Sequence, residues 1–391
     1  MSLNLVSEHI SWGQAFANSR GSTKIVEILG NSPRSLNTGI VDIEVRPVPV
    51  PIEPKGKPVQ DLGAMSRLPN EVMDMIVNKL DLLSAMKLSY VNRTANLLVQ
   101  QSPISFLRQW APGISKFLRQ TQAHLNWNLL ELKEAITREN CVVCGESSVQ
   151  LYLPTMERIC HPCVHDNHAY WCLPVEQAAL IFALDIPDLI DPQTMYLPQL
   201  SKIDLDYDDL GAWVVPIKLA LTKALKRHGT REGIKRAAEG KSPIPNVVEK
   251  YDNPDDEEFE VENQHDIYRA AKLYSPTPVR MRLLVSLGNY HRNAHHHEVA
   301  CRVPVVNRDN TRKTHYSCRG CTAMLTYNKG DRISDINMRL MRLDPNLDKY
   351  ERSFQIFRRA FCVWTEAELI EHVRSECIGG WILLYAEARD Q

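Results

Sequence analysis

Glycine is scarce in this sequence, and no glycine-rich motif is present. The 391 residues include only 17 glycines. The phosphate-binding patterns Gly-x-Gly-x-x-Gly and Gly-x-x-x-x-Gly-Lys-Ser/Thr do not occur, and neither do the Gly-x-Ser-x-Gly turn or the protein-kinase motif set. We therefore expect a protein that has no enzymatic activity of its own.

A strong net charge and a long apolar run are lacking as well. The 46 Lys and Arg residues are balanced by 47 Asp and Glu residues, which excludes a chain-wide polycation that coats nucleic acid. The most apolar stretch, 173–190, is interrupted by prolines and acidic residues, so we expect no membrane-spanning helix. Because the first residues contain no basic segment followed by an apolar one, we expect no secretory leader and a cytoplasmic or nuclear location.

The cysteines are concentrated in two short regions. Most of the ten lie in 141–172 and 301–321. Without a secretory route the thiols are expected to be reduced, and closely paired cysteines then indicate metal ligands before disulfides.

The first region contains two Cys-x-x-Cys pairs separated by fifteen residues. Two tight turns of this kind aim four thiolates at one tetrahedral metal and leave no position open, as in structural zinc sites. We predict a four-cysteine zinc module over 141–175. The alternatives are four buried core cysteines, or a RING-type ubiquitin ligase, which would need eight ligands in one compact segment. The predicted ligands are Cys141, Cys144, Cys160 and Cys163.

The second region contains a run of histidines followed by Cys301, Cys318 and Cys321. Three thiolates need one more ligand, and His297, four residues before Cys301, is our choice, although a neighbouring histidine or His315 could serve. A second structural zinc is therefore predicted within 265–330. The alternatives are a metal-free Cys-x-x-Cys turn, or a catalytic zinc with an open position, for which no general base such as that of His-Glu-x-x-His is evident.

The N-terminal part is expected to be weakly ordered up to residue 64. Five prolines between 47 and 58 hold the backbone extended and form a stiff linker. From 65 to 110 the apolar residues follow a helical period, and Pro69 suits a first helical turn. These three or four short helices are too small to be stable without a partner or a flanking domain.

Segment 65–110 resembles the F-box. Leu68-Pro69-Asn70-Glu71-Val72 matches the opening Leu-Pro-x-Glu-Ile/Leu/Val, and Val91-Asn92-Arg93 matches the step that closes the second helix. Together with the downstream Cys-x-x-Cys modules, the chain is similar to fungal F-box proteins. The chain departs from the F-box pattern at one point. The Leu-Trp expected after the third helix is not matched in register, because Trp110 lies further along the sequence than the pattern requires.

The resemblance implies the substrate-recognition subunit of a Skp–cullin–F-box ubiquitin ligase. Its partners would be a Skp-type adaptor with its cullin complex, and a protein substrate whose class no repeat indicates. The alternative is an ordinary three-helix part of a larger core, with the same positions buried inside the chain. The residues that would form the adaptor face, or the packing beneath it, are Leu68, Pro69, Val72, Ile76, Leu80, Leu83, Leu88 and Val91.

A basic block and an acidic block lie close together further along. Residues 218–241 contain eight Lys and Arg against two Glu, without an aromatic residue on which a base could stack. We expect a solvated helix within a helical region at 176–250, followed by an acidic loop at 251–264, and no nucleic-acid partner. The alternative function is a zinc-containing nucleic-acid or chromatin-associated protein that uses the basic block.

These elements predict a mainly α protein with small β/zinc modules. An N-terminal F-box three-helix unit is followed by a helical connector at 111–140 and by a mixed, mostly helical receptor region. The chain closes with a helical part at 331–391, where Thr365 and Glu368 form a capping box.

Overall fold

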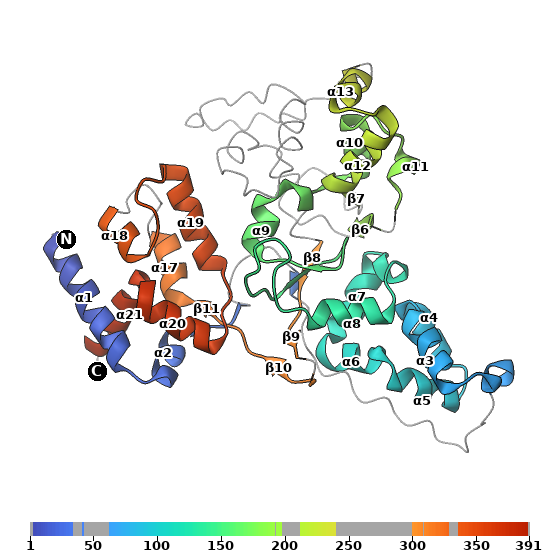
Figure 1. The fold of residues 1–391 in the computed structure, drawn as a ribbon, viewed down its shortest axis with the longest axis horizontal. Coiled ribbons are helices and arrows are strands. Elements are labelled where there is room, and N and C mark those ends of the chain that lie inside the picture. Colours follow the sequence, from blue (N-terminus) through green and yellow to red (C-terminus); the bar gives the residue numbers. More distant parts are fainter. Residues whose placement is uncertain are drawn as a thin grey trace.

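The computed structural model is mainly helical, with short strands in small sheets (Figure 1), which confirms the predicted fold class. The proline-rich linker, the acidic loop and His297 lie outside the described residues. The structure describes residues 3–33, 41–42, 62–191, 193–197, 212–239, 299–307, 309–327 and 335–389.

Segment 65–110 folds into four short α-helices preceded by a 3-10 turn. Polar residues separate them: Asp81 accepts a hydrogen bond from the Ser84 amide (2.9 Å), and Asn92 from the Ala95 amide (2.7 Å). Such side-chain caps satisfy the amides that each helix start leaves open. The elements are η2 (Gly63–Arg67), α3 (Asn70–Lys79), α4 (Leu82–Ser89), α5 (Arg93–Gln101) and α6 (Pro103–Trp110).

The connector and the first cysteine module share one core with these helices. Leu82 of α4, Leu132 of the connector and Leu151 of the module belong to the same buried cluster. A four-stranded sheet of order β2-β8-β3-β4 covers this core. The elements are α7 (Pro112–Gln120), η3 (Ala123–Leu125), α8 (Leu129–Thr137), α9 (His161–Asp166), η4 (His168–Tyr170), β2 (Val41–Asp42), β3 (Gln150–Tyr152), β4 (Glu157–Arg158), β8 (Ala300–Arg302), β9 (Val305–Val306) and β10 (Arg312–Lys313).

A second core lies between a three-stranded sheet of order β5-β7-β6 and the helices beside it. The basic block forms two of these helices, whose buried face includes Ala220, Ala224 and Ile234. The elements are β5 (Cys172–Pro174), β6 (Met195–Leu197), β7 (Ala212–Pro216), α10 (Val175–Ile181), α11 (Ile186–Leu189), α12 (Ile217–His228) and α13 (Arg231–Glu239).

The third core joins the two ends of the chain (Figure 1). The expectation of weak order up to residue 64 is wrong for residues 3–33, because Ala17, Ile25 and Leu29 are buried against the C-terminal helices around Trp381. The elements are α1 (Leu3–Ser19), α2 (Ser22–Leu29), β1 (Gly30–Asn31), β11 (Ser317–Cys318), α17 (Arg319–Tyr327), α18 (Asp335–Leu340), α19 (Lys349–Phe361), α20 (Glu366–Glu376) and α21 (Ile378–Arg389).

Candidate adaptor-binding surface and metal centres

The first cysteine group is assembled as its spacing predicts. The β3–β4 hairpin brings the second pair back to the first, and the four Sγ atoms lie within 4.8 Å of one another. The Sγ atoms of Cys144 and Cys160 are 3.6 Å apart, close to the ~3.8 Å that a tetrahedral zinc with Zn–S bonds of about 2.3 Å requires. Gly145, at a φ of 78°, turns the chain directly after the first pair.

The four side chains also form hydrogen bonds among themselves. The pKa of the Cys141 thiol lies well below its ordinary value, because the thiols of Cys144, Cys160 and Cys163 donate hydrogen bonds to its thiolate. The pKa of Cys160 is raised for the complementary reason, since its proton is shared with Cys141, and burial raises it further. A divalent cation would replace these protons and favour the thiolate form at every position.

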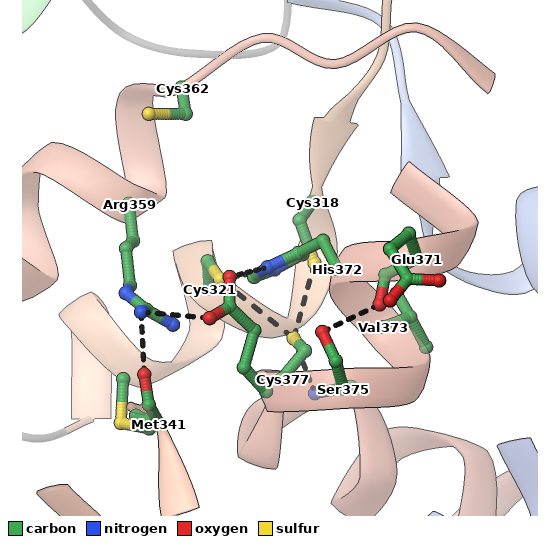
Figure 2. A network of polar contacts seen from close by, with 12 residues as sticks. Cys318, Cys321, Met341, Arg359, Cys362, Glu371, His372, Val373, Ser375 and Cys377 are labelled. Carbon is green, nitrogen blue, oxygen red and sulfur yellow. Dashed lines mark hydrogen bonds and ion pairs between the residues drawn. The ribbon is translucent and has the colours of Figure 1, made fainter. Parts of the chain in front are cut away.

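A second group of potential metal ligands forms, but with members other than those predicted. Cys318 and Cys321 meet His372 and Cys377, and all four side chains are buried. The Cys377 Sγ lies 3.4 Å from that of Cys318 and 3.8 Å from that of Cys321, whose Sγ is 3.1 Å from His372 Nε2. Figure 2 shows the three cysteines turned toward one another with His372 beside them.

The prediction that Cys301 joins this group is wrong. Cys301 lies in β8 opposite Leu151 of β3, so the sheet register carries it into the first core, whereas Cys318 lies in β11 and pairs with Gly30 of β1. Burial raises the pKa of the Cys301 thiol to about 12. Cys377, which neither predicted metal site includes, is a member of the group instead. The spacing His-x-x-x-x-Cys at 372–377 is the one sequence signal that points to the missing pair.

The second group has an outer layer of polar contacts. His372 Nδ1 lies 3.1 Å from Glu376 Oε1, and Glu376 Oε2 lies 3.2 Å from Arg359 Nη2. Burial alone would raise the pKa of Glu376, but the hydrogen bond from His372 and the charge of Arg359 hold it below its ordinary value. The Trp364 ring stacks on His372 at a centroid distance of 4.6 Å.

Helix α19 contacts the surroundings of both groups. Arg358 Nη2 lies 3.1 Å from Glu146 Oε1, in the turn that follows the first Cys-x-x-Cys pair. Phe361 packs on the His161 ring between Cys160 and Cys163, with centroids 4.5 Å apart. Because Arg359, the next residue after Arg358, faces Glu376, one helix connects the two groups.

Apolar side chains are exposed on the short helices after the linker. On α3, Val72 and Met75 face outward while Met73 and Val77 are buried. The largest exposures are those of Tyr90 at 78% and Val91 at 68%, at the turn between α4 and α5. The following residues therefore define what we call the exposed apolar strip: Leu68, Val72, Met75, Tyr90, Val91 and Leu97.

Residues 65–107 match the family model of the F-box domain. No curated protein and no solved structure matches the chain. The match spans α3, α4 and α5 and enters α6. A match to this domain suggests a role in substrate recognition within Skp–cullin–F-box ubiquitin ligases, and F-box proteins are typically adaptors rather than enzymes.

The predicted adaptor residues fall into two sets in the F-box. Four are exposed, and the other four are partly buried, with two of them, Leu80 and Leu88, packed against the first core. The prediction does not include the exposed residues Met75, Tyr90 and Leu97, although Met75 continues the helical period of Leu68 and Val72. The exposed set is Leu68, Pro69, Val72 and Val91, and the partly buried set is Ile76, Leu80, Leu83 and Leu88.

The basic block has acidic partners of its own. Lys223 Nζ lies 2.9 Å from Asp191 Oδ2, and Arg227 forms ion pairs with Asp185 and Asp188 around the short helix α11. These pairs reduce the positive charge that α12 offers to a phosphate backbone. In the described part of the chain, no helix is both long enough and apolar enough to cross a membrane.

Proposed function

We propose that this protein is the substrate-recognition subunit of a Skp–cullin–F-box ubiquitin ligase, and that it acts by binding its partners without catalytic activity of its own. The observation that carries the proposal is the coincidence of the F-box match at 65–107 with the exposed apolar strip. The rest of the chain would then hold the protein substrate.

The physical basis is the apolar surface that the F-box leaves uncovered. Each Å² of apolar surface removed from water contributes roughly 25 cal/mol, and amphipathic helices that bury such faces in a partner's groove are a common recognition mode. Tyr90 combines a large ring with a polar hydroxyl, the kind of side chain enriched where binding energy concentrates. The strip therefore supports binding to the Skp-type adaptor.

The test is co-purification of the full chain with a Skp-type adaptor and its cullin. Leu68→Ala combined with Pro69→Ala is expected to reduce adaptor recovery at least tenfold, because it removes apolar contact and the rigid entry to α3. Ile190→Ala, which changes an exposed apolar residue outside the F-box, is the matched control and should not change recovery. Undiminished recovery of the double variant would contradict the proposal.

We further propose that the first cysteine group holds one structural zinc ion. Four sulfur ligands at tetrahedral spacing fit zinc and leave no position for substrate or water. The ion would hold the β3–β4 hairpin against the first core. Since that core also contains the helices of the F-box, the metal would support the adaptor-binding part of the molecule.

A further inference from the structure

We propose that Cys318, Cys321, His372 and Cys377 bind a second zinc ion, which fastens the two ends of the chain into one module. The proposal is independent of adaptor binding. It begins from the convergence of three buried thiols and one imidazole, drawn from two parts of the sequence that lie more than fifty positions apart.

The distances between the four ligand atoms fit a metal better than they fit covalent or apolar packing. The S–S separations of 3.4 and 3.8 Å among Cys318, Cys321 and Cys377 are close to the ~3.8 Å expected around zinc. They are far longer than the ~2.05 Å of a disulfide. Three cysteines with one histidine are also an established set of ligands for structural zinc.

The surroundings of His372 fix the nitrogen that faces the sulfurs. A carboxylate can only accept, so Nδ1–H donates to Glu376, and Nε2 is the ring nitrogen directed at Cys321 and left to bind a metal. A carboxylate behind a metal-bound histidine is the usual way in which proteins orient such a ligand. Arg359 holds Glu376 in turn, and the Gly380 amide donates to Cys377 Sγ at 3.2 Å.

Three glycines permit the helix crossing that brings the ligands together. A Cβ on Gly320 would lie 2.2 Å from the Gly380 amide nitrogen, and one on Gly379 would lie 2.1 Å from the Gly320 carbonyl oxygen. The backbones of α17 and α21 therefore touch beside Cys321 and Cys377. So close an approach at the ligands themselves indicates that their convergence is built into the fold.

The metal would secure the N-terminal segment indirectly. Strand β11, which contains Cys318, pairs with β1 at Gly30, and Arg319 donates a hydrogen bond to the Ile28 carbonyl at 2.9 Å. Helices α1 and α2 thus rest on elements that carry the ligands. Loss of the ion is expected to loosen residues 3–31 together with the C-terminal helices.

The experiment measures zinc per chain by elemental mass spectrometry of the purified full-length protein. We expect two zinc ions in the wild type, one in His372→Ala and two in His372→Cys, because a fourth thiolate restores the tetrahedral set. Cys362→Ser removes a buried thiol of the same region that belongs to neither group and should retain two. One zinc in the wild type, or two in His372→Ala, would overturn the proposal.

Chelator competition supplies a second measurement in which all four proposed ligand residues are retained. Glu376→Gln is expected to weaken the second site by about 10–100-fold while the first is unchanged, giving two separate release steps. Release of both ions from this variant as in the wild type would contradict the role of Glu376. The amount of Skp-type adaptor that co-purifies with His372→Ala should equal the amount for the wild type. A failure of the second-zinc proposal is therefore distinguishable from a failure of the proposed adaptor binding.

Discussion

At the scale of single residues, Arg158 shows how the first core is tied together. Its side chain is fully buried, and the hydrogen bonds that it donates go to backbone carbonyls. Those of Val303 and Ile136 accept at 2.8 Å each, which joins the cysteine module to β8–β9 and to the last turn of α8. Burial lowers the pKa of Arg158 to about 10, so the guanidinium remains charged at neutral pH.

Arg158→Met should destabilise the protein by about 3 kcal/mol. The change preserves much of the volume but leaves the buried carbonyls without donors, and hydrogen bonds to charged groups contribute roughly 1.5–3 kcal/mol each. Urea unfolding monitored by circular dichroism measures the difference in the free energy of unfolding. Arg138→Met, at an exposed position nearby, should change it by less than about 0.5 kcal/mol; equal effects would show that Arg158 has no such role.

Single residues also show where sequence reasoning succeeds. The first group is predictable from a short stretch of sequence, because two Cys-x-x-Cys pairs are joined by a hairpin of only fifteen residues. So short a connection brings the second pair back to the first. The second group needs His372 and Cys377, which lie more than fifty positions after Cys318 and meet it only in the folded third core. Cys301 is nearer in sequence, but the pairing of β8 with β3 places it in another core, and single-sequence patterns do not reveal a pairing of this range.

At the scale of elements, the contact between α17 and α21 is the most demanding in the third core. Gly320 has no space for a side chain, because the atoms that a Cβ would meet belong to the backbone of Gly379 and Gly380. Cys321 lies in α17 and Cys377 directly precedes α21, so a shift of either helix would also disturb the second group. The local sequence hides this constraint, since glycine inside a helix ordinarily indicates weak helix propensity.

Gly320→Ala should therefore lower the free energy of unfolding of the third core by about 2–3 kcal/mol, as overpacking does at other tight contacts. Gly21→Ala is the matched control, because a Cβ at this position would meet no atom within 4 Å and the φ of −61° suits alanine. Thermal unfolding of both variants provides the comparison. A stability of Gly320→Ala equal to that of the control would show that the helices separate freely.

The N-terminal helices show a different limit of sequence reasoning at this scale. The proline-rich linker that follows them suggests weak order for the whole start of the chain. The apolar residues of α1 and α2 indicate stable helices only once their packing against α21 is known, because Trp381 and Leu384 of α21 are buried in the same core. A short amphipathic helix is marginal alone and is stabilised mainly by packing, so its partner decides whether it forms.

At the scale of the whole molecule, the F-box is continuous with the first cysteine module rather than joined to it by a loose hinge. The Leu129 amide donates to the Leu80 carbonyl at 3.0 Å, and residues from α3 to β9 share one buried cluster. The second group lies in a separate core. Damage to the two groups should therefore have different consequences for adaptor binding.

We expect Cys141→Ser to remove one zinc per chain and to lower the recovery of the Skp-type adaptor several-fold, because the first core loses the metal that stabilises it. Cys377→Ser should also remove one zinc but leave adaptor recovery unchanged. Zinc content and adaptor recovery measured on the same preparations test the pair. Equal recovery for both variants, whether reduced or retained, would show that the cores do not behave as separate units.

The packing of α1 along α21 has a practical consequence for experiments on this protein. Both helices lie at one end of the molecule, and α3 and α5 lie at the other (Figure 1). An affinity tag or an immobilisation handle at either end of the chain would therefore point away from the F-box. A donor and an acceptor fluorophore placed on α1 and α21 would report directly, by energy transfer, whether the third core is closed.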